Sequence, residues 1–161
     1  MHTSNIWLLF GLLSIAILAS SCQKADIYQD NIDFTTAGWD ADSAYVFKVR
    51  IDNERSAYDI IYHVRHNLDY PFYNLYIKYT VADSAGNEYL TDRQQVTLLD
   101  EQTGKPRGSG LGGIYGKDFM GIQGIRFRKP GLYRFKVMQY MRRDPLPGIV
   151  SFGIQVKEQE L

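Results

Sequence analysis

Residues 45–51 read Tyr-Val-Phe-Lys-Val-Arg-Ile, and this stretch decides the fold class. Two basic side chains, Lys48 and Arg50, fall between apolar side chains that recur at every second position: Tyr45, Phe47, Val49 and Ile51. Successive side chains of a β-strand point to opposite faces, so a period of two puts one face on a core and the other in water. The stretch therefore predicts a half-buried strand.

The same alternation continues along the chain. It recurs at residues 58–64, 75–81, 96–98, 125–127, 133–137 and 150–156. Clusters of Gly, Pro, Asn and Asp separate these runs and are typical of turns, at 52–54, 83–87, 102–106, 129–131 and 145–148. The best helix candidate is only residues 139–143. Seven to eight strands without helices between them predict an all-β fold, an antiparallel β-sandwich that resembles a jelly roll.

Charge and length limit the possible classes. The chain has 161 residues with 18 basic and 18 acidic side chains, none of them within residues 1–21. The remainder fits one domain, which we place at 43–161. A formal net charge of zero argues against a dedicated nucleic-acid binder. Residues 22–101 nevertheless carry a net charge of −7, and residues 102–161 carry +7.

The N-terminus predicts a lipid anchor. Residues 6–18 are mostly apolar and too few to span a bilayer, as in the core of a signal peptide. They lead into Leu18-Ala19-Ser20-Ser21-Cys22, which contains the only cysteine of the chain and resembles a bacterial lipobox. We therefore expect a signal peptide over 1–21, acylation of Cys22, and a polar tether over 22–42. Gln23 after the cysteine favours the outer membrane over the inner membrane.

Motifs for catalysis or for cofactors are weak. Residues 108–113 match G-x-G-x-x-G, but no helix is expected after them, so a flexible loop is the better interpretation. His63 and His66 would point to opposite faces of one strand, which argues against a metal site. No nucleophile or paired-carboxylate motif marks an active site. We expect no enzymatic activity, no metal and no cofactor.

Two groups of side chains are candidate partner contacts. Tyr70, Phe72 and Tyr73 interrupt the strand pattern and either pack on the core or face a partner. The basic residues Arg126, Arg128, Arg142 and Arg143 could face an acidic protein surface or lipid phosphates. Cross-strand pairing with the acidic half of the chain is the alternative for these arginines.

Several segments resemble the GldH-type gliding-motility lipoproteins of the Bacteroidetes. Besides Cys22, they are RHNLDYPFYNL at 65–75, FRKPGLY at 127–133 and QYMRRDPLPGI at 139–149. The resemblance implies a cell-envelope lipoprotein needed for gliding, by a machinery coupled to type IX secretion, with Cys22 as the lipid site. Our hypothesis is therefore a non-enzymatic, lipid-anchored protein that assembles or stabilises this machinery, with other envelope lipoproteins or secretion-machinery proteins as partners. The alternatives are a surface carbohydrate-binding sandwich, with Tyr70, Phe72 and Tyr73 as a stacking platform, and an envelope hydrolase.

Overall fold

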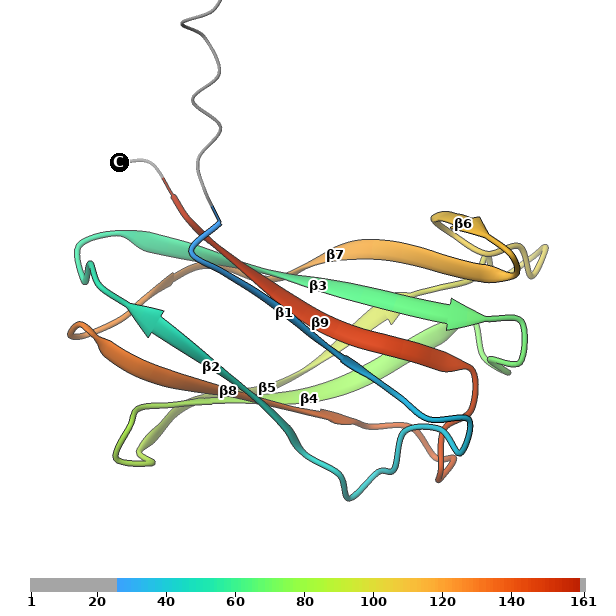
Figure 1. Ribbon diagram of the computed structural model, residues 1–161, viewed down its shortest axis with the longest axis horizontal. Helices are drawn as coiled ribbons and strands as arrows, with labels where there is room; N and C mark the ends of the chain where they lie inside the picture. Colours follow the sequence, from blue (N-terminus) through green and yellow to red (C-terminus); the bar gives the residue numbers. More distant parts are fainter. Residues whose placement is uncertain (1–25, 160–161) are drawn as a thin grey trace, which may run out of the picture.

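The computed structural model describes residues 26–159, which form two antiparallel sheets packed face to face (Figure 1). The described residues contain nine strands and no helix, so the predicted all-β sandwich is confirmed. The expected signal peptide and the lipid site Cys22 lie outside the described residues. Within residues 26–159, no helix is long and apolar enough to cross a membrane.

Five strands form the upper layer in Figure 1, in the order β1-β9-β3-β7-β6. Their bounds are β1 (Tyr28–Asp33), β9 (Ile149–Glu158), β3 (Ala57–Asn67), β7 (Ile114–Arg126) and β6 (Ser109–Leu111). The lower layer has the order β2-β8-β4-β5. Its strands are β2 (Tyr45–Ile51), β8 (Gly131–Gln139), β4 (Asn74–Ala82) and β5 (Glu88–Thr97).

The pairing of the strands is that of a jelly roll. The first long strand pairs with the last, and the series continues inward as β1·β9, β2·β8, β3·β7 and β4·β5, all antiparallel. The chain is thus one long hairpin, rolled so that successive strand pairs fall in alternate sheets. The short strand β6 extends the five-stranded sheet beside β7.

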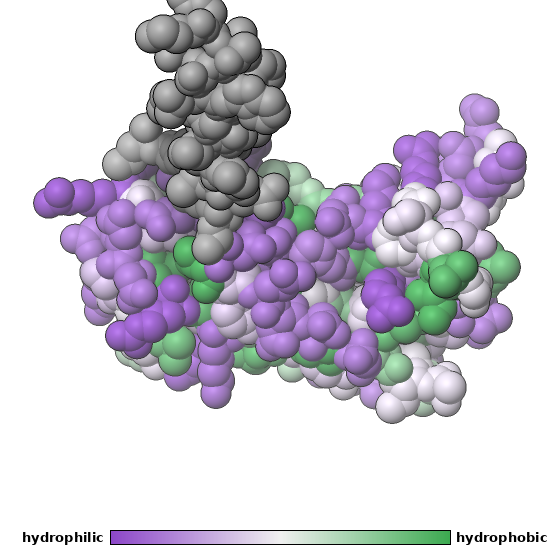
Figure 2. Space-filling view, turned by 45° about the horizontal axis from the view of Figure 1, so that its top comes forward, coloured by the Kyte–Doolittle hydropathy of each residue, from purple (hydrophilic) through white to green (hydrophobic). Residues whose placement is uncertain are grey.

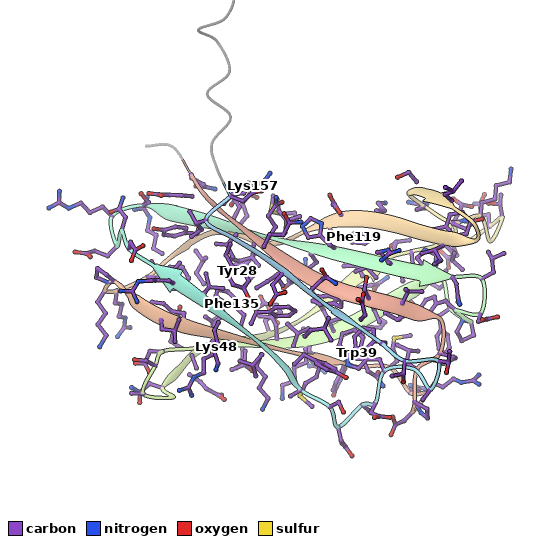
Figure 3. All side chains as sticks on the ribbon, viewed as in Figure 1. Tyr28, Trp39, Lys48, Phe119, Phe135 and Lys157 are labelled. Carbon is purple, nitrogen blue, oxygen red and sulfur yellow. The ribbon has the colours of Figure 1, made fainter. Side chains whose placement is uncertain are left out.

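Residues Tyr45–Ile51 form β2, as their alternating pattern predicted. Phe47 lies opposite Phe135 of β8, and both side chains are buried between the sheets. Lys48 lies opposite Arg134, and both side chains are exposed on the other face. Figure 3 shows Tyr28 and Phe135 between the two sheets, with Lys48 below them and Lys157 above them.

The expected tether over 22–42 is wrong from Tyr28 onward. β1 pairs with β9 through six residues, and the Trp39 side chain is completely buried. Trp39 stacks on Phe34 with 4.7 Å between ring centroids, and its backbone exchanges two hydrogen bonds of 2.9 Å with Leu146. The sandwich therefore begins at β1 rather than at residue 43, and the aromatic residues of this polar segment help to fill the core.

Two further expectations need correction. The glycine-rich residues 108–113 do not form a loop throughout, because Ser109–Leu111 pairs with β7 as β6. The helix candidate at 139–143 is wrong as well. The Tyr140 backbone N–H donates to the Tyr76 carbonyl at 2.8 Å, which continues the β8·β4 ladder past the end of β8 and keeps the chain extended there.

We expect Trp39→Ala to lower the free energy of unfolding by about 3–5 kcal/mol, because it leaves a large cavity in the core. Urea denaturation followed by circular dichroism measures this loss. The matched control is Tyr140→Ala, at a side chain that is 52% exposed, with an expected loss below about 1 kcal/mol. Equal losses in the two variants would contradict a structural role for the segment before residue 43.

Candidate functional site

A shallow groove lies on the outer face of the four-stranded sheet, and we call it the aromatic groove. It has a volume of about 850 Å³ and is lined by Phe72, Tyr76, Arg93, Gln95, Tyr140, Met141 and Arg142. β4 and β5 supply its floor, and the segment after β8 supplies one wall. It combines aromatic rings with guanidinium groups, which suits recognition of a ligand that is partly apolar and partly anionic.

Strand register brings Tyr76 and Gln95 together. They lie opposite one another on β4 and β5, and neither side chain is buried. The Tyr76 hydroxyl donates a hydrogen bond of 2.6 Å to the Gln95 side-chain oxygen. This bond fixes the direction of the Tyr76 ring, which is 39% exposed and offers one flat face to a ligand.

A cation–π contact forms the wall of the groove. The Arg93 guanidinium carbon lies 5.2 Å from the centroid of the Tyr140 ring. The sulfur of Met141 accepts a hydrogen bond of 3.2 Å from the Tyr76 backbone N–H, so the wall and the floor are joined. These contacts preorganise the guanidinium and the ring before any ligand binds.

The three predicted aromatic contacts do not form one platform. Tyr70 belongs to the core: it is 3% exposed, and its hydroxyl donates a hydrogen bond of 2.6 Å to the Asn74 carbonyl. Phe72 is half-buried and lines the aromatic groove, whereas Tyr73 is exposed but does not line it. Tyr70 is thus wrong as a partner contact. Tyr76 could have been found, because it occupies an outward position in a predicted strand.

The four predicted arginines do not form one patch either. Arg126 donates a hydrogen bond of 3.0 Å to the Arg55 carbonyl, and Arg128 lines a second hollow of about 430 Å³ near Tyr89 and Tyr133. Arg142 and Arg143 lie beyond the opposite end of β8. The nine residues of β8 separate the two pairs by roughly 30 Å. Of the four arginines, Arg142 alone lines the aromatic groove.

The two histidines of the described chain have different environments. The His63 Nδ1 lies 2.6 Å from an oxygen of Asp118, on the outer face of the five-stranded sheet. His66 is completely buried, with Tyr115 stacked on it at 5.8 Å between centroids. Burial lowers the pKa of His66, although a hydrogen bond with the Asn67 carbonyl opposes that shift. Within residues 26–159, no three His, Cys, Asp or Glu side chains are placed to hold a metal ion.

Figure 2 shows the side on which the five-stranded sheet comes forward. Hydrophilic side chains cover most of this face, with apolar atoms in smaller groups between them. The sandwich therefore has two different faces, because the aromatic groove lies on the outer face of the other sheet.

A jelly-roll topology, with an open groove on one sheet, places the chain in the class of β-sandwich proteins. The chain belongs to the GldH lipoprotein family, whose model matches residues 26–156. This match runs from just before β1 into the last strand, so it includes both sheets and the groove. The resemblance predicted from the sequence is confirmed.

Two relatives match over almost their whole length. The gliding motility lipoprotein GldH homolog of Christiangramia forsetii is 23% identical over 158 residues, which covers 94% of this chain and 95% of that protein. The gliding motility lipoprotein GldH of Flavobacterium johnsoniae is 24% identical over 164 residues, with coverage of 92% and 95%. A structure of infectious bursal disease virus aligns with a TM-score of 0.34 and 13% identity, over 83% of this chain and 30% of that one.

Gly148 allows the segment after β8 to pass close to Tyr70. A Cβ atom on Gly148, which has φ of +79°, would lie 2.2 Å from the Tyr70 backbone nitrogen. We expect Gly148→Ala to lower the free energy of unfolding by more than about 2 kcal/mol. Gly86, with φ of +92° and open space around it, is the matched control. Gly86→Ala should cost only the backbone strain of about 1–2 kcal/mol. Urea denaturation compares the two, and an equal loss would contradict the close approach.

The burial of His66 predicts a pH-dependent stability. Its pKa in the folded chain lies below the ordinary value of 6.5, so the unfolded chain takes up the proton first. The contribution of His66 to the free energy of unfolding is therefore fully present above pH 6.5. It falls as the pH drops through that value toward the lowered pKa. Denaturation series between about pH 8 and about pH 5 should show this fall, and His66→Gln should reduce it. A slope that is unchanged in His66→Gln would contradict the assignment.

Proposed function

We propose that acyl chains on Cys22 anchor this sandwich in the cell envelope, where it acts as a non-enzymatic assembly or stabilising component of the gliding and type IX secretion machinery. The family match over residues 26–156 is the observation that carries this proposal, because it covers the sandwich as a unit. The names of both relatives, gliding motility lipoproteins, support a role in gliding. The partners in this proposal are other envelope lipoproteins or proteins of the secretion machinery.

The distance from Cys22 to the sandwich supports tethering as the mechanism. Asp26 is four residues after Cys22 and two residues before β1. Four residues span at most about 14 Å in any conformation. The anchor would thus hold the sandwich at the membrane surface and raise its local concentration near partners in the same membrane. Gln23 after the cysteine supports placement in the outer membrane.

We expect Cys22→Ala to move the protein from the membrane fraction to the soluble periplasm, because no acyl chain can then be attached. Cell fractionation with immunoblotting measures this shift, and labelling with radioactive palmitate should mark the unchanged chain but not Cys22→Ala. Ser21→Ala is the matched control, since it alters the neighbouring small residue and keeps the thiol. A Cys22→Ala protein that stays in the membrane fraction would refute the anchor.

A carbohydrate-binding role is the second candidate, and the aromatic groove is the observation that favours it. Tyr76 and Tyr140 are partly exposed and line the groove beside the polar Gln95 side chain. Aromatic rings next to a polar amide can stack on a sugar ring and bind its hydroxyl groups. The earlier platform of Tyr70, Phe72 and Tyr73 is replaced here because Tyr70 is buried. Glycan-array binding that is lost in Tyr76→Ala/Tyr140→Ala would favour this role over assembly.

A further inference from the structure

We propose that the outer face of the four-stranded sheet is a docking surface for an acidic polypeptide segment of a partner protein. This face lies on the side of the sandwich that is turned away from the membrane. This inference rests on the proposed anchoring at Cys22 and names the chemistry of the partner. Four observations carry it: the charge of the face, the composition of the groove, an open strand edge, and the place where the chain leaves toward its anchor.

The outward side chains of this sheet are strongly basic, and we call them the basic face. They are Lys48 and Arg50 of β2, Lys78 of β4, Arg93 of β5, and Arg134 and Lys136 of β8. The cross-strand register puts all six on the same side of the sheet.

Few acidic groups compensate this charge. β2, β4 and β8 contain no Asp or Glu. β5 contains Glu88, in an outward register position at its far end, and Asp92, whose register position opposite the buried Tyr79 is on the inner side of the sheet. Asp52 forms an ion pair of 3.2 Å with Arg50. Among the ion pairs of the described residues, no other involves the basic face. A partner with clustered carboxylates would satisfy the remaining cations.

The aromatic groove supplies anchoring pockets beside the basic face. Tyr, Arg and Met are the residue types most enriched at the centres of protein interfaces, and Tyr76, Tyr140, Met141 and Arg93 provide them here. An acidic segment with an occasional apolar side chain would place that side chain between the rings and its carboxylates on the guanidinium groups.

The edge of the sheet favours a polypeptide over an acidic polysaccharide. β5 is the last strand in the order β2-β8-β4-β5, and within the described residues it pairs with β4 alone. Its outer edge borders the groove at Arg93 and Gln95. The Arg93 backbone N–H already donates a hydrogen bond of 2.7 Å to the Asp92 carboxylate, so an added strand would pair with other backbone groups of this edge. An extended polypeptide can form this ladder of hydrogen bonds along β5, whereas a glycan has no matching repeat of donors and acceptors.

The start of the described chain turns the basic face away from the anchor. An Asp26 carboxylate oxygen lies 3.7 Å from the Lys157 amine, and its other oxygen accepts a hydrogen bond from Gln155. Gln155 and Lys157 are on the outer face of the five-stranded sheet, and Figure 3 shows Lys157 and Lys48 on opposite sides of the sandwich. The four residues between Cys22 and Asp26 span at most about 14 Å, so the membrane would lie next to the five-stranded sheet. The lipid phosphates of that membrane are therefore not the ligand of the basic face.

The test uses the full lipoprotein extracted in mild detergent. The variant Lys78→Glu/Lys136→Glu reverses two charges on neighbouring strands of the basic face, and no hydrogen bond or ion pair is described for either side chain. The matched control, Arg65→Glu/Lys105→Glu, makes the same change of net charge on the other sheet and in a loop. Circular dichroism confirms that both variants are folded.

The probe is a fluorescent peptide in which Glu alternates with Leu and Tyr, compared with the same peptide with Gln in place of every Glu. We expect saturable binding of the Glu peptide, weakened about tenfold or more in Lys78→Glu/Lys136→Glu, unchanged in the control, and reduced by salt. Tyr76→Ala/Tyr140→Ala should weaken it as well. Equal binding of the Gln peptide, or equal loss in the control, overturns the proposal.

Two competitors of the Glu peptide test whether the basic face binds an acidic polysaccharide or a lipid instead. Polygalacturonate that displaces the peptide and itself binds more tightly would assign the face to a polysaccharide. Glycerophosphoglycerol, the water-soluble head group of phosphatidylglycerol, cannot bind through the acyl chains on Cys22. If it displaces the peptide and itself binds more tightly, the face is assigned to a lipid surface, and either result overturns the proposal. Fractionation of Cys22→Ala tests the anchor separately. If Cys22→Ala is soluble but the unchanged chain does not bind the peptide, the anchor stands and only the docking surface is refuted.

Discussion

The exclusion of charge from the layer between the two sheets is the constraint on which this structure depends. Each strand of a sandwich must turn every second side chain into that layer, and the buried partners Phe47 and Phe135 show how it is filled. The charged residues between them, such as Lys48 and Arg134, are then forced onto the opposite side of the sheet. The alternation that forms the core therefore also decides that these basic side chains share the outer surface of the four-stranded sheet.

Alternation was enough to predict the class of fold, because it needs only neighbouring residues. It failed where the pattern is broken by local chemistry. β1 was missed because Asp30 stands between Tyr28 and Ile32 in the series that faces the core. β7 was largely missed because its glycines and register shifts hide the period of two. Trp39 gave no periodic signal at all, since it enters the core from an isolated bridge to Leu146 rather than from a strand.

The groove was predicted least well, and the reason is its long-range origin. Tyr76 meets Gln95 through the register of β4 and β5, and Arg93 meets Tyr140 across 47 positions of sequence. No local pattern contains such pairs. Tyr70 is a different case: its place in a loop sequence left both core packing and contact with a partner open, and a hydrogen bond to the Asn74 carbonyl lets its hydroxyl be buried at low cost. Composition identified the right residue types, and only the topology could sort them between core and surface.

The position of β1 has a mechanical consequence for a protein held by its N-terminus. β1 is an edge strand whose ladder runs to β9 alone, so a pulling force applied at the anchor acts first on this ladder. Force directed outward from the sheet would peel such a strand one rung at a time, beginning with Tyr28 and Val156. The contacts of Asp26 with Lys157 and Gln155 are closer to the anchor than the Tyr28–Val156 pair. They must therefore break before the force reaches that pair. Under tension, the Asp26 carboxylate therefore delays the separation of β1 from β9.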